Sequence, residues 1–313
     1  MDMGAVERIH KSAIPPGAQI LTGRFVYTIK KKPVEKESDW AGAHVDWDRK
    51  LDARLCIRGF LEDLDKSASA PTVCINTIRS ILSLVPVLGW DFRVLDISRA
   101  YLQSNDLFRT VYMKPPAQTE EDGVYWLVKK PVYGLCDATK GWYDALKEFL
   151  VEKLGARVSE ADPAMFYWSG HEKKNFYKER KTCKSWEDLK HSSLPDEVDN
   201  HIESAKVWGV VTTHVDDLQM FGDQEFLKWI TKEILNRFKC KGYEENKATY
   251  LGMLVEKHEN GSISIDAQNY EDCIDIVHIS PERHQDNNAI LNPIEEAEFR
   301  SALGRIMWLV RFT

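Results

Sequence analysis

Residues 207–222 read VWGVVTTHVDDLQMFG, and two adjacent aspartates, Asp216 and Asp217, interrupt this apolar run. Neighbouring carboxylates repel each other, and burying them is costly unless a cation or a proton compensates their charge. Carboxylate oxygens are preferred ligands of Mg²⁺, so a bound cation would stabilise the pair. For two aspartates taken alone, a solvated turn is the alternative. The apolar context favours a metal site on a strand-like segment.

A second apolar segment also carries one carboxylate. In WDFRVLDIS (90–98), Asp96 is surrounded by Val94, Leu95 and Ile97. Two strands that each present one acidic side chain can lie side by side in one sheet, where their carboxylates converge. The alternative for Asp96 is a helix-capping or strand-end role.

Length and composition indicate an ordinary intracellular protein. The 313 residues suffice for one large domain or for two to three subdomains. No stretch reaches the roughly 18 apolar residues of a membrane helix, and the N-terminus lacks the apolar segment of a signal peptide. The six cysteines are scattered without a CxxC pair. This pattern argues against a zinc site and a disulfide framework, and it favours a reducing compartment.

The charge is unevenly distributed. A net charge of −7 argues mildly against nucleic acid as a partner, because phosphate binding depends on Lys and Arg. Residues 1–60, however, carry 11 Lys and Arg against 8 Asp and Glu. The basic residues include Lys30–Lys32 and the series Arg49, Lys50, Arg54 and Arg58. A solvated face is the simpler explanation of this cluster.

Hydrophobic periodicity predicts a mixture of strands and helices. Strands are expected at 19–32, 54–61, 90–98, 111–116, 124–130, 163–168 and 207–221. Helices are expected at 72–89, 139–156, 224–239 and 295–312. A hairpin is expected at 250–267 around an Asn-Gly turn, and a loop at 36–48. Residues 171–206, with 8 basic and 8 acidic side chains, are expected to form a solvated insertion. The irregular alternation indicates an α+β fold with an antiparallel sheet.

An ordered series of short motifs then becomes specific. It runs RLCIRGF, LGWDFRVLDISRAYLQ, VYMKPP, KKPVYGL, GWYDAL, THVDDL, YLGM and FRSALGRIMWL. This series resembles the reverse transcriptase of copia-type retrotransposons, whose typical motifs are ARLVARGF, GW…LDVKNAFLHG, VYMEQPPGF, SLYGLKQAPRAWY, YVDDLL, FLGI and YRSLVGSLLYL. The resemblance covers residues 20–312, and motifs in this order are far more specific than any one of them.

The resemblance implies a right-hand polymerase, an RNA-directed DNA polymerase that is part of a Pol polyprotein. Its antiparallel palm sheet would be backed by helices. The expected parts are fingers at 1–90 with a return segment at 107–140, a palm at 91–106 and 141–245, and a primer-grip-like hairpin with a truncated thumb at 246–313. The expected partners are an RNA or DNA template with its primer, and dNTPs. No membrane is expected as a partner, and the place of action would be the cytoplasm (particle-associated) or the nucleus.

The resemblance also implies the catalytic set. Asp96 matches the first catalytic aspartate, and Asp216 and Asp217 match the pair in the palm turn. Together with the backbone of Ile97 they would hold two Mg²⁺ ions, with Mn²⁺ as the alternative. Such ions activate the primer 3′-hydroxyl and neutralise the triphosphate.

Further residues match substrate-binding positions of that family. Tyr101 would lie under the sugar and exclude a 2′-hydroxyl, which separates rNTPs from dNTPs; a core tyrosine is the alternative. The other residues expected near the dNTP are Ala100, Arg54, Lys50, Arg58, Tyr133 and Gly134. The residues expected near the primer are His214, Tyr250, Leu251 and Gly252.

Four departures from the family pattern are visible, one of which is the insertion at 171–206 that lengthens the expected palm. His214 stands where Tyr or Phe is usual, Cys136-Asp137-Ala138-Thr139 replaces Lys-Gln-Ala-Pro, and Leu51-Asp52 replaces a basic-neutral pair. Asp137 is expected to add repulsion near the template. A repurposed copy that binds nucleic acid without catalysis is therefore an alternative. An unrelated Mg²⁺-dependent phosphohydrolase would share the carboxylates but would not explain the ordered motifs.

Overall fold

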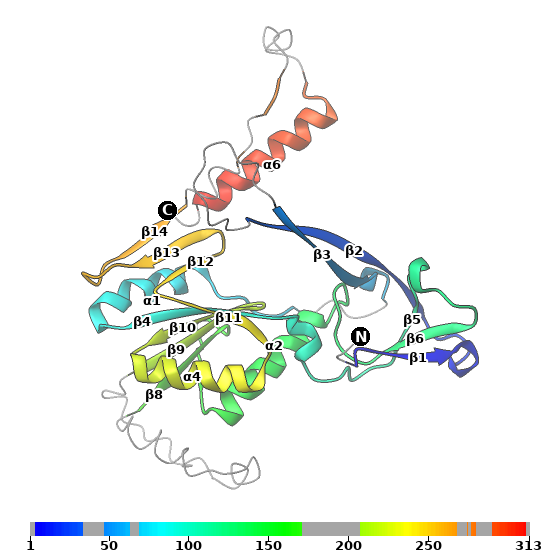
Figure 1. Cartoon of the computed structure of the whole chain (residues 1–313), viewed down its shortest axis with the longest axis horizontal. Coiled ribbons are helices and arrows are strands. Elements are labelled where there is room, and N and C mark those ends of the chain that lie inside the picture. The colour runs from blue at the N-terminus through cyan, green and yellow to red at the C-terminus, as the bar shows by residue number, and fades with distance from the viewer. Residues whose placement is uncertain are drawn as a thin grey trace. The chain divides into compact units, whose positions relative to one another are not determined.

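The computed structural model divides into two compact units, each described here by itself (Figure 1). Unit 1 comprises Met1–Ala70 and Arg99–Leu154, and unit 2 comprises Pro71–Ser98 and Gly155–Thr313. The structure describes residues 4–33, 47–62, 69–170, 207–267, 274, 277–279 and 290–310. The unit boundaries fall at different residues from the fingers and palm boundaries expected from the sequence.

Unit 2 is built on a six-stranded antiparallel sheet in the order β11-β4-β10-β9-β8-β7. The two central partners, β4 and β10, are mostly apolar, with Arg93 and Gln219 as buried polar residues inside them. All the strands of this sheet pair antiparallel, so the mixture of helices with an antiparallel sheet that the sequence predicts is confirmed for unit 2. The strands are β4 (Asp91–Ile97), β7 (Arg157–Val158), β8 (Met165–Ser169), β9 (Val207–His214), β10 (Asp217–Gly222) and β11 (Cys240–Glu245).

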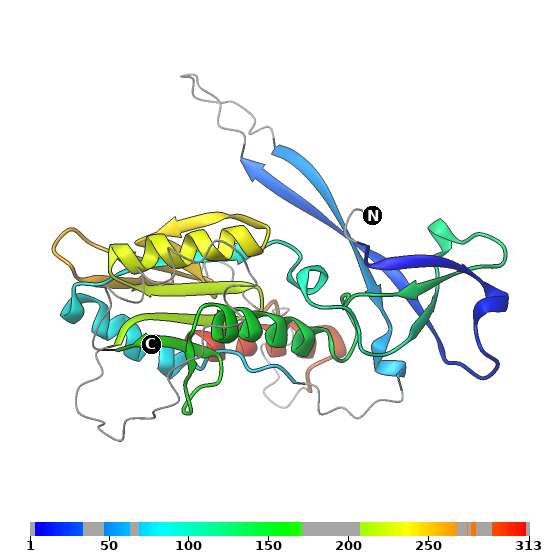
Figure 2. The ribbon, with the colours of Figure 1, turned by 90° about the horizontal axis from the view of Figure 1, so that it is seen from below.

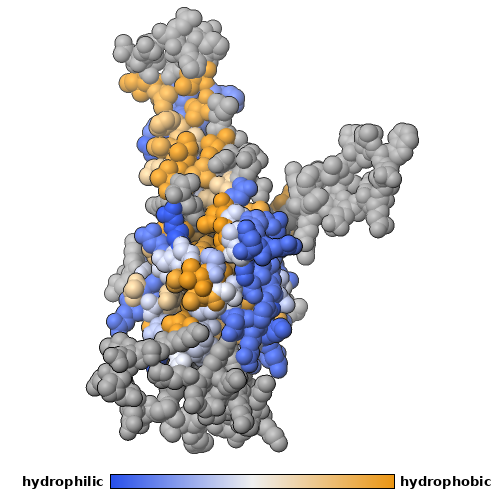
Figure 3. Space-filling view, turned by 90° about the vertical axis from the view of Figure 1, so that its left-hand side faces the viewer, coloured by the Kyte–Doolittle hydropathy of each residue, from blue (hydrophilic) through white to orange (hydrophobic). Residues whose placement is uncertain are grey.

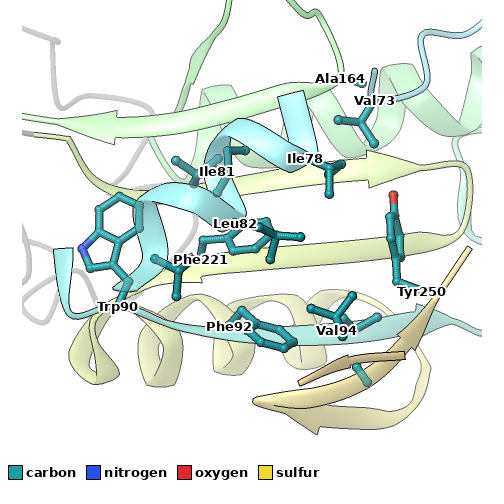
Figure 4. Packing of buried hydrophobic residues seen from close by; sticks show 14 residues of the cluster. Val73, Ile78, Ile81, Leu82, Trp90, Phe92, Val94, Ala164, Phe221 and Tyr250 are labelled. Carbon is teal, nitrogen blue, oxygen red and sulfur yellow. The ribbon is translucent and has the colours of Figure 1, made fainter. Parts of the chain in front are cut away.

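Two helices cover opposite faces of this sheet (Figure 2). Helix α1 (Ile75–Leu88) packs on the face that presents Phe92 and Phe221, where alternate residues of neighbouring strands form one buried cluster (Figure 4). Helix α4 (Gln224–Arg237) packs on the other face. There its fully buried Phe226 lies against Gly209 and Gly222, two positions without a Cβ.

The start of α1 depends on a distant carboxylate. Cys74 occupies the position before the helix and makes no side-chain cap. Instead, buried Asp162 accepts hydrogen bonds from the Cys74 N–H, at 2.9 Å, and from the Thr77 hydroxyl, at 2.6 Å. An aspartate oxygen satisfies free N–H groups at a helix start, so Asp162 supplies the missing cap.

The C-terminal part of unit 2 holds a small sheet and a long helix. Strands β12 (Lys247–Tyr250), β13 (Met253–Lys257) and β14 (Ile263–Asp266) form an antiparallel three-stranded sheet. Helix α6 (Pro293–Val310) follows. Many of its apolar side chains are exposed, and they gather in the upper part of the space-filling view (Figure 3).

Unit 1 contains a five-stranded mixed sheet in the order β1-β6-β5-β2-β3. Its longest element is the hairpin of β2 (Ile20–Pro33) and β3 (Trp47–Ile57), whose register places Lys31 opposite Arg49 and Lys30 opposite Lys50. Strands β1 (Val6–His10), β5 (Val111–Lys114) and β6 (Val124–Val128) complete the sheet, with β2 and β5 parallel. Helix α2 (Ala138–Glu148) continues as a π-helical turn, η5 (Phe149–Lys153). Short 3-10 turns are η1 (Lys11–Ala13), η2 (Gly59–Leu61), η3 (Ala100–Gln103) and η4 (Ala117–Thr119).

Most expected elements are present, and two are corrected. The strand expected at 54–61 ends at Ile57, and Gly59–Leu61 is the turn η2. The segment 207–221 is two strands, because the chain reverses at Val215 and Asp216. The loop expected at 36–48 lies almost wholly outside the described residues, and the insertion expected at 171–206 lies entirely outside them. None of the helices that the structure describes is long and apolar enough to cross a membrane.

Candidate active site

The strand register of unit 2 brings the expected catalytic residues together. In the β4–β10 ladder Asp96 lies directly opposite Asp217, and in the β9–β10 ladder Asp217 lies opposite His214. The Ile97 N–H donates to the Asp216 carbonyl oxygen across 2.9 Å, which ties the end of β4 to the turn. Asp96 and the adjacent pair Asp216 and Asp217, about 120 positions further along the chain, thus lie at one edge of the sheet.

The turn that carries Asp216 is strained. It contains two residues, Val215 and Asp216, and Val215 has a φ of 59°. A positive φ is unfavourable for a β-branched residue, because its Cβ crowds the backbone. Backbone strain of this kind is often retained at functional sites. No residue pattern in the segment predicts this conformation of Val215.

Burial and neighbouring charges raise the pKa values of two side chains at this edge of the sheet, Asp217 and Cys240. Burial, together with the carboxylates of Asp216 and Asp96, raises the pKa of Asp217 to about 6, although Lys241 acts to lower it. The same cause acts on Cys240, where burial and Asp96 raise the pKa of the thiol to about 11. Both shifts report that negative charge is concentrated and poorly solvated at this edge.

A lysine side chain, Lys241, lies beside the carboxylates at this edge of the sheet. A bulge in β11 around Gly242 directs Lys241 to Asp96, and the ammonium lies 2.6 Å from Oδ2. The other oxygen, Oδ1, is buried and has no hydrogen-bond partner among the described residues. Lys241 was missed from the sequence, because it reaches Asp96 only through the pairing of β11 with β4.

These oxygens fit a divalent cation in their chemistry. The unpartnered Oδ1 of Asp96 and the raised pKa of Asp217 both mark carboxylates that lack sufficient positive charge. An all-oxygen donor set is the one that Mg²⁺ prefers. As the side chains stand in the described part of the chain, no three His, Cys, Asp or Glu residues converge closely enough to hold a metal ion. Binding an ion therefore requires side-chain rearrangement, including at Lys241.

The expected primer-side residues surround the same edge of unit 2. The His214 ring meets the Tyr250 ring edge-on, with centroids 6.4 Å apart. Tyr250 is only 2% exposed, and burial, Asp217 and Asp162 raise its pKa. The structure thus places Tyr250 beneath the surface, whereas Leu251 and Gly252 form the turn between β12 and β13.

Several residues expected near the dNTP come together in unit 1. The Tyr101 and Tyr133 rings pack edge-to-face at 4.9 Å, and the Arg54 guanidinium lies 5.4 Å from the Tyr133 centroid. Gly134 allows a close approach, but to the chain itself, because a Cβ there would collide with the Ile57 carbonyl. Ala100 is buried beside Tyr101.

Backbone pairing fixes the positions of two further basic residues expected near the dNTP, Arg58 and Lys50. Arg58 is exposed, and its N–H donates to the Thr22 carbonyl. Lys50 lies in β3 opposite Lys30. The hairpin register therefore joins the two basic clusters that are separate in the sequence.

Asp137, whose negative charge is expected to repel the template, forms an ion pair with Arg109. Arg109 donates to both Asp137 oxygens, at 2.8 and 3.0 Å, and to both Glu62 oxygens, at 2.8 and 3.1 Å. Although burial opposes ionisation, the bonds to Arg109 lower the pKa of Asp137. Its charge is thus compensated within unit 1. Arg109 was missed, because nothing in its sequence context marks a partner.

The antiparallel sheet with opposed carboxylates at one edge defines an α+β protein with a candidate cation site. The profile of the family "Reverse transcriptase (RNA-dependent DNA polymerase)" matches residues 13–175, just over half of the chain. The chain belongs to this reverse transcriptase family.

Named relatives agree with this assignment. The retrovirus-related Pol polyprotein from transposon TNT 1-94 of Nicotiana tabacum is 30% identical over 164 residues, which cover 49% of this chain and 11% of the relative. That from transposon RE1 of Arabidopsis thaliana is 32% identical over 120 residues, 36% of this chain and 8% of the relative. The chain thus matches about a tenth of the length of these polyproteins.

Two solved structures show a distant similarity. The foamy viral protease-reverse transcriptase in complex with double-stranded DNA aligns over 91% of this chain and 37% of its own, with 10% identity and a TM-score of 0.40. Apo telomerase from Candida tropicalis aligns over 83% and 57%, with 9% identity and a TM-score of 0.36.

Proposed function

We propose that the chain is the RNA-directed DNA polymerase part of a copia-type polyprotein, which adds dNMP to a primer 3′-hydroxyl. The observation that carries the proposal is the register of Asp96 opposite Asp217, with Asp216 in the adjoining turn. Membership of the reverse transcriptase family supports it. The antiparallel sheet of unit 2 would act as the palm, and the β2–β3 hairpin of unit 1 as part of the fingers.

Asp96, Asp216 and Asp217 would hold two Mg²⁺ ions, with Mn²⁺ as the alternative. When bound, such ions activate the attacking hydroxyl and neutralise the triphosphate. The protein's own contribution is to fix the backbone positions from which the three carboxylates extend. The ladder fixes Asp96 against Asp217, and the bond from the Ile97 N–H holds the turn that carries Asp216. Such fixed groups lower the barrier without reorganising during the reaction.

The dNTP side of the proposal rests on the aromatic pair in unit 1. The edge-to-face contact with Tyr133 restricts the Tyr101 ring, and a fixed ring can exclude a 2′-hydroxyl by its bulk. Arg54, Arg58 and Lys50 supply positive charge on the same unit for the triphosphate or template. The compensation of Asp137 by Arg109 removes one reason to expect an inactive copy.

Primer extension tests the proposal directly. The purified chain is incubated with a primed RNA template, dNTPs and Mg²⁺, with Asp216→Asn as the matched control. Incorporation by the wild type at least 100-fold above the control is expected, since the substitution removes a metal ligand. Equal incorporation by the two proteins refutes catalysis. Binding of the primer–template with a steep salt dependence, but without synthesis, would favour the non-catalytic alternative.

A further inference from the structure

The turn between β12 and β13 has a backbone that its sequence does not favour. Tyr250 and Met253 close the turn, and the two residues between them, Leu251 and Gly252, have φ values of 50° and 84°. Left-handed conformations at both positions suit Asn-Gly or Gly-Gly. For leucine this conformation is unfavourable, because the Cβ crowds the backbone. Leu251 must therefore be held in place by contacts outside the turn.

The first contact comes from the core of unit 2. Leu251 packs against the buried cluster that includes Tyr250 and Val255, and Met253 is 1% exposed. Figure 4 shows Tyr250 pointing from the small sheet into this cluster. The turn is thus fixed from its inner side.

The second contact comes from α6, more than fifty residues further along the chain. The indole Nε1–H of Trp308 donates to the Leu251 carbonyl oxygen across 3.3 Å. Trp308 is half-buried, whereas its neighbours on α6, Ile306 and Met307, are 48% and 58% exposed. The hydrogen bond therefore ties α6 to the residue whose backbone is strained.

We propose that Trp308 is a positioning residue for the primer end. Its indole N–H fixes the Leu251 carbonyl, and thereby the Leu251–Gly252 turn at which the primer strand would bind. The inference deepens the proposed function and rests on it. Because Trp308 and the turn both belong to unit 2, loss of the bond should affect primer binding without changing the dNTP contacts proposed for unit 1.

The test compares Trp308→Phe, which keeps an aromatic ring but lacks the N–H, with Met307→Ala on the same helix. Trp308→Phe should raise the Kd for primer–template and the KM for primer about 3- to 10-fold, the effect of one neutral hydrogen bond. The KM for dNTP and kcat at saturating primer should stay within about twofold of wild type, because the proposed dNTP contacts belong to unit 1. Met307→Ala should change none of these values.

Hydrogen exchange supplies a readout that does not depend on activity. Amides of residues 247–257 should exchange faster in Trp308→Phe than in wild type, whereas those of α4 should not. Trp308→His retains a ring N–H, so its exchange and Kd should lie closer to wild type than those of Trp308→Phe. If Trp308→Phe does not fold, Trp308→His is compared with Met307→Ala instead, and a larger change in Trp308→His than in Met307→Ala supports the role of Trp308.

The outcomes separate the two proposals. If wild type binds primer–template but incorporates no dNTP, the polymerase proposal fails, while a raised Kd and faster exchange in Trp308→Phe still support the role of Trp308. Equal Kd and equal exchange in Trp308→Phe and Met307→Ala overturn the role of Trp308, even if wild type extends primers. A wild type that neither binds nor extends overturns both.

Discussion

The Lys241 ammonium and Asp96 Oδ2 lie 2.6 Å apart at the edge of the sheet where Asp96 faces Asp217. Lys241 also lowers the pKa of Asp217, against the larger effects of burial, Asp216 and Asp96. In the metal-free protein, this lysine is thus a counter-ion for a group of carboxylates. A divalent cation that binds Asp96 must compete with it.

Replacing Lys241 by Met should therefore change the response to Mg²⁺. Without metal, the free energy of unfolding should fall by less than about 1 kcal/mol, because both side chains are partly exposed. The rise in melting temperature on adding Mg²⁺ should be larger than in wild type. Differential scanning fluorimetry with EDTA and with a Mg²⁺ titration measures both effects.

Lys247→Met is the matched control. Lys247 pairs with Glu256 at 2.9 Å with similar exposure, but away from the three aspartates. This variant should lose a similar amount of stability and show the wild-type response to Mg²⁺. An identical Mg²⁺ response in Lys241→Met and wild type would show that Lys241 does not compete with the cation.

The raised pKa of Asp217 predicts a pH-dependent stability. In the unfolded chain this carboxyl titrates near 3.8, and in the folded chain at about 6. Between these values the folded protein binds more protons, so its free energy of unfolding falls as the pH rises from about 4 to about 6. Above about pH 6 the folded protein carries the full loss of stability from an ionised Asp217, unless a cation offsets it.

Asp217→Asn should remove this contribution. In EDTA, the variant should melt at the same temperature as wild type below pH 4 and at a higher temperature above pH 6.5. The difference in melting temperature should grow as the pH rises from about 4 to about 6. Saturating Mg²⁺ should reduce this difference. Asp106→Asn, at a side chain that is 75% exposed, is the control for the loss of one negative charge. A difference independent of pH would contradict the shift.

The ion cluster around Arg109 predicts a large and specific loss. Arg109→Met leaves Glu62, whose side chain is 2% exposed, and Asp137 without their cation. Removing one partner of a buried ion pair leaves an uncompensated charge, so stability should fall by about 3 kcal/mol. Urea unfolding measures the loss.

Neutralising the two carboxyls should restore part of this loss. The triple variant Arg109→Met, Glu62→Gln, Asp137→Asn should be more stable than Arg109→Met alone, because no charge is left unpaired. A triple variant less stable than Arg109→Met would show that packing, rather than charge, causes the loss.

The sequence predicts those features that depend on local pattern. The apolar alternation around Asp96 and Asp217 places both on strands, and the motif order implies that they meet. The register in the structure agrees. Both ends of β3 were misplaced, because pairing with β2 rather than periodicity sets its length. The strand begins at Trp47, so that it includes polar residues such as Asp48, and it ends at Ile57.

The remaining features depend on tertiary contacts. Lys241 reaches Asp96 only through a bulge in β11, and Arg109 finds Asp137 and Glu62 across segments that share no motif. The positive φ of Val215 is imposed by the two-residue connection of β9 and β10. Neither hydrophobic period nor residue spacing carries this information.

Two glycines with opposite surroundings test the packing of the sheet against α4. A Cβ at Gly209 in β9 would collide with the ring of Phe226, which is fully buried and cannot move away. Gly209→Ala should therefore destabilise the protein by about 1–3 kcal/mol, as overpacked cores do. Gly304 on α6 has no atom within 4 Å of the position of a Cβ. Gly304→Ala should instead stabilise α6 by up to about 1 kcal/mol, since alanine is the better helix former. Opposite shifts of the melting temperature are expected, and a stabilised Gly209→Ala would mean that α4 does not pack on β9 through Phe226.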